Sequence, residues 1–357
     1  CTKCREVCPV EGAIAFEDSV RMLERTVGAV IVAVGASLLD CRTLPQLGYG
    51  TLQGVVTSLE FERLLAADGP LGGDLRTPEG KAPSRIALIQ CTGSLDAYHA
   101  SYCSEICCRS ALKYRAMLRE RLPDSEIVHF VKEWCLPGCQ AQVLYESAME
   151  DRSAFFVRYA DIGSFSVQPS KSRLRLSCRD MSGSQCGNEF DMIILCPAVV
   201  PAGDAATLAK TLRMRPSRYG FVYSGLSGFE HETKAPRGIL AVGSCSGPKD
   251  IRTAATEGGA AAGRILAELK NTGRLEVNPT RAHIVCERCS GCGICAAVCP
   301  LGAIVVDKDG KRAEVISELC DGCGVCVAGC PAAAIVGNHF TDEQIRAELD
   351  GLLDTGM

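Results

Sequence analysis

The sequence predicts an α/β protein that ends in a separate cysteine-rich unit. Buried-strand segments alternate with helical stretches from about residue 28, and two similar halves repeat near the C-terminus. The 23 cysteines fall mostly in C-x2-C and C-x3-C spacings. With 357 residues and 47% hydrophobic content, the chain is long enough for two or three domains with cores of their own.

Composition excludes several classes of function. The net charge of −4 and the scattered basic residues argue against nucleic acid as the main partner. The longest apolar run, around residues 28–35, has the length of a buried strand and not the roughly 18–20 residues of a membrane span. We expect neither a membrane span nor a signal peptide. Clustered thiols are typical of soft-metal ligation in a reducing cytosol, which predicts a cytoplasmic protein.

We divide the chain into five parts: a cysteine-rich segment (1–20), an α/β body (21–270), a linker (271–282), the repeated unit (283–337) and a C-terminal helix (338–357). A long helix is expected over 251–270, antiparallel strands over 155–196, and a capping box at Thr341. Because the chain begins inside a cysteine motif, we expect it to be the C-terminal part of a longer protein, or a processed or partial chain. The expected strands are Ala29–Val34, Arg85–Cys91, Glu126–Val131, Phe155–Tyr159, Leu174–Cys178, Met192–Cys196 and Ile239–Val242.

The strongest motif, C-x2-C-x2-C-x3-C-P, occurs twice at an offset of 31 residues, from Cys289 and from Cys320. In bacterial ferredoxins, three close cysteines of this run bind one [4Fe–4S] cluster, and the cysteine before proline binds the neighbouring cluster. Zinc sites usually pair two C-x2-C units and fit this spacing poorly. The predicted ligands are Cys289, Cys292, Cys295 and Cys330 for one cluster, and Cys299, Cys320, Cys323 and Cys326 for the other.

A third motif opens the chain. Cys1, Cys4 and Cys8, followed by Pro9, have the last three cysteine positions of the same pattern. We predict a further [4Fe–4S] site whose fourth ligand lies upstream or elsewhere in the chain. The alternative is a residual ferredoxin fold without its cluster.

Four further cysteines, Cys91, Cys103, Cys107 and Cys108, follow the unusual spacing C-x11-C-x3-C-C. Cys91 ends a predicted strand, and the other three open a predicted helix. Adjacent thiols point about 100° apart on a helix, so both reach one cluster only at its first turn, where free amides favour thiolates. Spacing alone leaves open whether these four bind a cluster or are inert buried thiols.

The remaining cysteines carry weaker signals. Cys178 and Cys196 lie in apolar strands and are expected in the core. Cys286 is not needed as a ligand, because the two motifs already supply four cysteines to each cluster. Cys135 and Cys139 lie on a predicted turn, and three interpretations stay open for them: ligands, a redox pair or a packed turn.

Several stretches resemble HdrA, the iron–sulfur flavoprotein of heterodisulfide reductase, and the likeness covers nearly the whole chain. The resemblance implies that Cys91, Cys103, Cys107 and Cys108 bind an atypical [4Fe–4S] cluster. It also implies a thioredoxin-reductase-like, FAD-binding three-layer body. The stretches are QCTGSLD (90–96), YCSEICC (102–108) with Lys113, VGAVIVAVG (27–35), VTSLEFE (56–62) and GSCSGPKDI (243–251).

The flavin contacts are expected in two places. Residues Gly243 to Ile251 form a loop between a predicted strand and the N-terminus of the 251–270 helix, which suits a phosphate or flavin edge. Lys249 and Asp250 are the candidate contacts there, and Lys113 matches a family lysine near the reactive flavin edge. Two features depart from the family: the chain lacks the G-x-G-x-x-G fingerprint, and its 134–139 segment differs from the family's Gly-Lys-containing turn.

The resemblance implies an electron-transfer oxidoreductase subunit, with flavin-based electron bifurcation and with the disulfide chemistry on partner subunits. The implied partners are other subunits of a heterodisulfide-reductase-like complex, ferredoxin and a hydrogenase or dehydrogenase donor, with this chain as a homodimer within the complex. Two alternatives stay open: a relay or scaffold that carries clusters only, and a component that feeds aromatic or sulfur-compound reduction.

Overall fold

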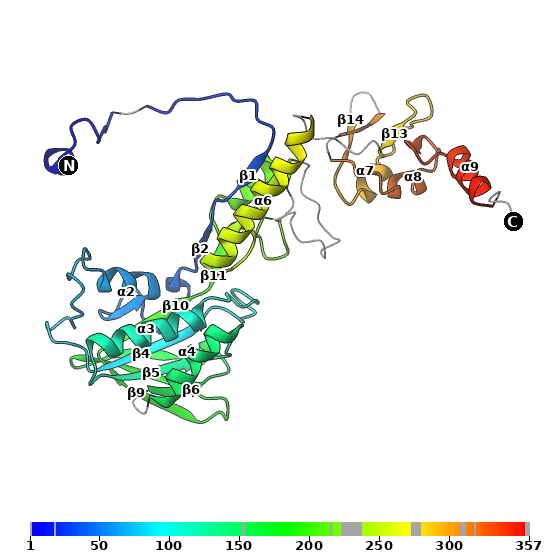
Figure 1. Cartoon of the computed structure of the whole chain (residues 1–357). Helices are drawn as coiled ribbons and strands as arrows, with labels where there is room; N and C mark the ends of the chain where they lie inside the picture. The colour runs from blue at the N-terminus through cyan, green and yellow to red at the C-terminus, as the bar shows by residue number, and fades with distance from the viewer. Residues whose placement is uncertain are drawn as a thin grey trace.

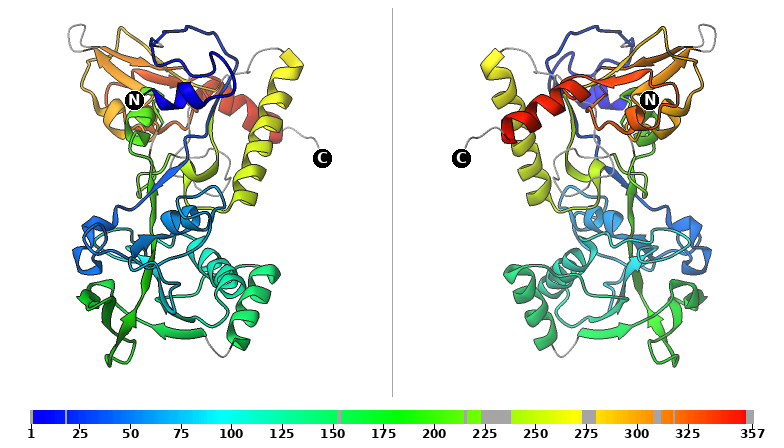
Figure 2. Two further views of the ribbon diagram at one scale, coloured as in Figure 1. Left: turned by 90° about the vertical axis from the view of Figure 1, so that its left-hand side faces the viewer. Right: turned by 90° about the vertical axis from the view of Figure 1, so that its right-hand side faces the viewer.

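The computed structural model describes residues 2–17, 19–151, 154–214, 216–222, 238–272, 280–307, 312–317 and 319–353. In Figures 1 and 2 the largest lobe lies at one end and the cysteine-rich unit of 280–337 lies toward the other. Strand β1 (Val30–Val32) and helix α6 (Ile251–Thr272) lie between them. Among the described residues, no helix is long and apolar enough to cross a membrane.

The large lobe is built on a parallel sheet with the strand order β3-β10-β4-β5-β6. Its central strands are mostly apolar and are buried on both faces, as expected for a covered parallel sheet, with Gln90 and His129 as buried polar residues. Helices α2 and α3 cover one face, and a three-stranded antiparallel meander covers the other. The strands are β3 (Val55–Thr57), β4 (Arg85–Thr92), β5 (Glu126–Val131), β6 (Ala154–Arg158), β7 (Ser166–Ser170), β8 (Arg173–Arg179), β9 (Gln185–Phe190) and β10 (Met192–Pro197), and the helices are α2 (Ser58–Leu65), α3 (Cys107–Arg121) and α4 (Cys139–Glu150).

The two sides of this sheet have separate cores. Phe61 and Leu118 pack with Leu88 on the helical side, whereas Leu176 and Phe190 pack with the strands on the meander side. The expectation of antiparallel strands over 155–196 is right only for β7, β8 and β9. Strands β6 and β10 join the parallel sheet instead, because their apolar residues pair with β5 and β4.

A second, smaller part of the structure contains two short strand pairs and the long helix α6. Strand β1 (Val30–Val32) pairs in parallel with β12 (Ile239–Ala241), and β2 (Ala36–Leu38) pairs antiparallel with β11 (Val199–Pro201). Helix α5 (Ala205–Thr211) packs beside them. Helix α6 (Ile251–Thr272) confirms the predicted long helix. Each predicted strand is present, with bounds that differ by at most two residues.

The cysteine-rich unit is an internal repeat in three dimensions. Strand β13 (Ala282–Ile284) pairs with β16 (Ile335–Gly337), and β14 (Ile304–Asp307) pairs with β15 (Arg312–Val315). Helices α7 (Ile294–Val298) and α8 (Val325–Ala328) occupy equivalent places in the two halves. The core of this unit mixes small aliphatic side chains with cysteines.

Both ends of the described chain are short exposed helices. Helix α1 (Lys3–Val7) and helix α9 (Asp342–Leu353) have no buried residues. The predicted capping box of α9 is confirmed, since Gln344 N donates to Thr341 Oγ1 at 3.3 Å and Thr341 N donates to Gln344 Oε1 at 3.1 Å.

Candidate metal centres

The structure brings the first predicted ligand set together around one cavity. Cys289, Cys292, Cys295 and Cys330 all line it, although Cys330 comes from the other half of the repeat. The amide of Ala313 donates to Cys289 Sγ at 3.5 Å, and the amide of Ala334 donates to Cys330 Sγ at 3.3 Å. Hydrogen bonds from the amides of Ala313 and Gly291 lower the pKa of the Cys289 thiol, which favours the thiolate that binds metal.

The second cavity is the counterpart in the other half. Cys320, Cys323 and Cys326 line it together with Cys299. The amides of Ala282 and Ala303 donate to Cys320 Sγ at 3.4 Å and to Cys299 Sγ at 3.3 Å. Gly322 has a φ of +70°, and a Cβ there would meet Thr280 O at 2.6 Å, so only glycine fits this turn between the ligands.

The donor chemistry of both cavities fits an iron–sulfur cluster. Each supplies four cysteine sulfurs and inward-pointing backbone amides, and such hydrogen bonds to the sulfurs are part of the surroundings of protein-bound clusters. The part of the chain that the structure describes contains no group of three or more His, Cys, Asp or Glu side chains arranged to hold a single metal ion.

The structure gives little further evidence on the metal site predicted from the N-terminal motif. Cys1 lies outside the described residues. Cys4 is exposed on α1, and the Cys8 thiol donates to Val10 O at 3.4 Å. The third ferredoxin-type site therefore stays a prediction from spacing.

The atypical cysteines gather at the carboxyl edge of the parallel sheet. Cys91 is the next-to-last residue of β4 and has a φ of +53°, a strained value for a residue with a side chain. Cys107 and Cys108 open α3, as predicted, whereas Cys103 lies in the loop before that helix. Cys91, Cys107 and Cys108 are buried, and Cys103 is half-buried. A hydrogen bond with the Cys107 thiol and, next, burial raise the pKa of the Cys91 thiol.

The segment 132–138, which follows β5, closes this site. Cys135 N donates to Cys108 Sγ at 3.4 Å, and Cys108 Sγ donates to Glu133 O at 3.5 Å. Cys135, Trp134 and Leu136 pack on the cluster of Cys107 and Cys108. Cys135 is therefore packed in this turn beside the Cys107 and Cys108 side chains, and its role as a ligand or redox partner stays a prediction. Cys139 instead is exposed at the start of α4.

Cys135 could have been found from strand order. Strands β4 and β5 are parallel neighbours, so their carboxyl ends meet at one edge of the sheet and place Cys91 near the residues after Val131. Cys196 lies at the end of β10 on the other side of β4 and packs into the same cluster. The expectation that Cys178 and Cys196 are core residues is confirmed, because both are buried.

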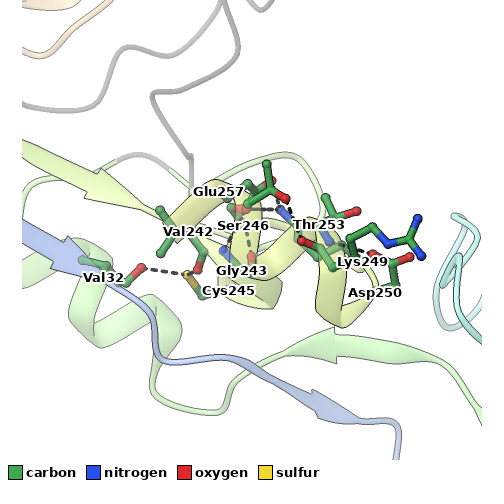
Figure 3. A network of polar contacts seen from close by, with 11 residues as sticks. Val32, Val242, Gly243, Cys245, Ser246, Lys249, Asp250, Thr253 and Glu257 are labelled. Carbon is green, nitrogen blue, oxygen red and sulfur yellow. Dashed lines mark hydrogen bonds and ion pairs between the residues drawn. The ribbon is translucent and has the colours of Figure 1, made fainter. Parts of the chain in front are cut away.

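The predicted flavin loop forms a compact polar network (Figure 3). Lys249 Nζ donates to Ser246 Oγ at 2.7 Å and to Glu257 Oε1 at 2.7 Å, and Gly243 N donates to Glu257 Oε2 at 2.8 Å. Asp250 accepts from Thr253 N at 2.8 Å, in the N-cap position of α6. Ile251 is exposed. The predicted residues of this loop therefore lie together at a helix N-terminus.

Lys113 and Arg109 share a face of α3 but have different partners. Lys113 Nζ lies 2.7 Å from Glu62 Oε1 on α2. Burial alone would raise the pKa of Glu62, but hydrogen bonds from Lys113 and Tyr114 outweigh it and lower that pKa. Arg109, which the sequence did not single out, lies 2.8 Å from Asp250. This α3 cation contacts the loop 243–251, where the sequence predicts flavin contacts.

Comparison with known proteins identifies the group to which these features belong. A family model described as a 4Fe-4S dicluster domain matches residues 288–334, which include every cysteine of the two cavities. The chain is 36% identical over 303 residues to one of two HdrA iron-sulfur subunits of the CoB–CoM heterodisulfide reductase of Methanopyrus kandleri, with 84% of this chain and 46% of that protein covered. The chain is an HdrA-like protein. The resemblance seen in the sequence is confirmed.

Other relatives cover even more of this HdrA-like chain. It is 33% identical over 359 residues to the HdrA iron-sulfur subunit of the CoB–CoM heterodisulfide reductase of Methanocaldococcus jannaschii, with 99% of this chain and 54% of that protein covered. The chain spans about half the length of the curated relatives it matches. Among solved structures, Lactococcus lactis thioredoxin reductase is similar with a TM-score of 0.42 and 14% identity, over 67% of this chain and 65% of that one.

Proposed function

We propose that this chain is an electron-transfer subunit of a heterodisulfide-reductase-like complex and holds [4Fe–4S] clusters and FAD. The observation that carries the proposal is the pair of cavities in the cysteine-rich unit, each lined by four cysteines with one ligand crossing from the other half. This arrangement matches the two-cluster ferredoxin pattern. Two neighbouring clusters in one small unit suit the passage of single electrons.

A third centre is proposed at the carboxyl edge of the sheet. Cys107 and Cys108 pack in one buried cluster there, Cys91 lies buried at the end of β4, and Cys103 lies in the loop before α3. Cys107 and Cys108 lie at the first turn of α3, where unpaired amides favour negative sulfur. This set fits the atypical cluster that the resemblance implies.

FAD is proposed to bind at the loop of residues 243–251. A bound flavin exchanges electron pairs for single electrons, which clusters alone do not do. In this chain, the N-terminus of α6 offers amides to a phosphate or ring edge, whereas the amide of Gly243, at the left-handed turn of the loop, already donates to Glu257. Lys249 is paired with Glu257 and Asp250 with Arg109, so a flavin contact by either side chain competes with an existing ion pair.

The wider role follows from these parts. We propose that the chain passes electrons between flavin and ferredoxin or partner subunits in an electron-bifurcating complex of the cytoplasm, with disulfide chemistry on those subunits. A homodimer within that complex and a hydrogenase or dehydrogenase as donor belong to the same proposal. The names of the relatives support the complex and, for some, ferredoxin as a reactant.

The proposal is tested by anaerobic purification with iron, sulfide and flavin counted per chain. We expect about four clusters and one FAD from the motif count. Cys108→Ala should remove about four iron atoms and one electron paramagnetic resonance (EPR) signal, whereas Cys178→Ala, a matched change of another buried cysteine, should remove none. Retention of every signal in Cys108→Ala would contradict the third centre. Iron without flavin would favour the relay that carries clusters only.

A further inference from the structure

Two cysteines outside the proposed metal sites face each other across a pair of antiparallel strands. Cys178 of β8 is the register partner of Cys186 of β9, and their Sγ atoms lie 3.8 Å apart. The two cavities of the cysteine-rich unit are lined by other cysteines. Directly opposite residues of antiparallel strands have Cα atoms about 4.5–5.5 Å apart, which falls within the range of disulfide-bonded cysteines. A change in side-chain torsion angles is therefore enough to bring the two sulfurs to bonding distance.

The turn between β8 and β9 holds the two strands in this register. Asp180 Oδ1 accepts a hydrogen bond from Ser184 N at 2.9 Å, and Asp180 N donates to Ser184 O at 3.0 Å. Gly183 in the same turn has a φ of +83°, a left-handed conformation that glycine adopts without strain. Because the geometry of the turn fixes the register of a hairpin, Cys178 and Cys186 stay opposite each other.

The two thiols differ in their access to solvent. Cys178 is fully buried in the core on the meander side of the sheet, whereas Cys186 is half-buried and packs against that core. Burial and, next, the charge of the neighbouring Cys186 raise the pKa of the Cys178 thiol to about 12. Since the thiolate is the form that attacks a disulfide, Cys186 should react first and Cys178 second.

We propose that Cys178 and Cys186 form a redox-active dithiol that exchanges with a low-molecular-weight disulfide. In the first step, the Cys186 thiolate attacks one sulfur of that disulfide, which forms a mixed disulfide and releases one small thiol. In the second step, the Cys178 sulfur attacks Cys186 Sγ, which forms the cross-strand disulfide and releases the second small thiol. The protein loses two electrons and two protons, and the small disulfide gains both. No cluster or flavin takes part, so this site goes beyond the proposed function and does not rest on it.

Peptide mapping of the anaerobically purified protein tests the proposal without a variant. After incubation with oxidised glutathione and alkylation of the remaining thiols, most chains should carry a disulfide between Cys178 and Cys186. Trypsin cuts between these two cysteines, after Arg179, so mass spectrometry detects the linked peptides. Fragmentation of the longer peptide then distinguishes Cys186 from Cys196. Alkylation of both Cys178 and Cys186 in nearly all chains would overturn the proposal.

Cys245 is the internal control for opening of the fold in this experiment. It is buried, and its thiol donates to Val32 O at 3.3 Å and to Val242 O at 3.1 Å. Oxidised glutathione should therefore leave Cys245 unmodified. Equal modification of Cys245 and Cys186 would mean that the reaction follows unfolding of the chain, and it would overturn the proposal.

Single variants test the order of the two steps. Cys178→Ser should accumulate a mixed disulfide of Cys186 with glutathione, because the thiol of the second step is missing. Cys186→Ser should leave Cys178 unmodified, because Cys178 is fully buried and has lost the thiol that reacts first. A mixed disulfide that forms on Cys178 in Cys186→Ser as fast as the disulfide forms in wild type would overturn this order.

Discussion

Arg109 Nη1 lies 2.8 Å from Asp250 Oδ2, so the residue directly after Cys108 contacts the N-cap of α6. The same guanidinium donates through Nη2 to Pro137 O. One side chain therefore joins three segments: the helix that carries the thiols, the segment 132–138 and the loop 243–251. In the proposed function, these are the cluster side and the flavin side of the molecule. Arg109 is a positioning residue between them.

Removal of this guanidinium should loosen the segment that holds Cys135. In Arg109→Ala the hydrogen bond to Pro137 O is lost, and we expect iodoacetamide to label Cys135 roughly fivefold faster in protein without bound iron, as for loss of one hydrogen bond from a charged donor. Mass spectrometry of timed samples measures the rate. Arg252→Ala is the matched control, because the Arg252 guanidinium donates to the exposed Gln140 side chain at 2.9 Å. Equal labelling rates in Arg109→Ala and wild type would refute this role.

The second prediction concerns the cysteine that each cavity receives from the other half of the repeat. Cys330 lines the cavity of Cys289, Cys292 and Cys295, although it is the last cysteine of the motif in the other half. Cys330→Ser should therefore disturb the cluster of that cavity and leave the cluster of Cys320, Cys323 and Cys326 intact, with loss of one of two ferredoxin-type EPR signals.

To assign the lost signal, Cys330→Ser is compared with Cys289→Ser and Cys320→Ser. It should match the first spectrum and differ from the second. Cys286→Ser changes an exposed cysteine that lies in neither cavity and should leave both signals. A spectrum of Cys330→Ser that matches Cys320→Ser would mean that the ligands are not crossed.

Much of this architecture could be predicted from sequence because it depends on local patterns. Short-range spacing predicted both cysteine sets of the repeat, and mostly apolar segments between turn signals predicted the buried strands such as Glu126–Val131. The parallel pairing of β6 and β10 was missed, since pairing partners far apart in sequence leave no periodic signal.

The same limit applies to the site. Cys135 and Arg109 act through contacts that depend on which strand ends and helices become neighbours, and nothing in their own sequence surroundings marks them. Lys249 was predicted as a flavin contact from its loop alone. Its ion pair with Glu257, eight residues away on α6, is visible only once the helix turns that carboxylate back over the loop.

The Lys249–Glu257 pair should contribute to stability more than the surface ion pairs do. The exposed side-chain fractions are 10% for Lys249 and 24% for Glu257. The Glu257 carboxylate also accepts a hydrogen bond from the amide of Gly243. Lys249→Met should lower the free energy of local unfolding by about 2 kcal/mol, because it leaves a partly buried carboxylate without its cation. Hydrogen exchange of α6 measures this. The control, Arg63→Met, breaks an exposed pair with Asp68 and should cost less than about 1 kcal/mol. Equal effects of the two changes would contradict the ranking.

His129 makes the last prediction, on pH. It is fully buried in β5 beside Gln90, and burial, with a smaller contribution from the charge of Arg115, lowers its pKa to about 3. The unfolded chain binds a proton at this residue near pH 6.5, whereas the folded chain does not. Stability from this group is therefore present above pH 6.5 and is lost progressively as the pH falls toward 3.

Between pH 7 and pH 5, this group should remove about 2 kcal/mol from the free energy of opening β5, by the difference in proton binding between the two states. His129→Gln keeps an amide near Gln90 but does not titrate. Between pH 7 and pH 5, the free energy of opening β5 should therefore fall about 2 kcal/mol less in this variant than in wild type. Hydrogen exchange of peptides that cover Glu126–Val131 measures both proteins at the two pH values. His339→Gln, a change outside the sheet in the turn between β16 and α9, should behave as wild type. Parallel pH profiles for His129→Gln and wild type would mean that His129 takes up its proton in the folded chain as it does in the unfolded chain. That result would contradict the argument from its burial, in which Nε2 has no hydrogen-bond partner among the described residues.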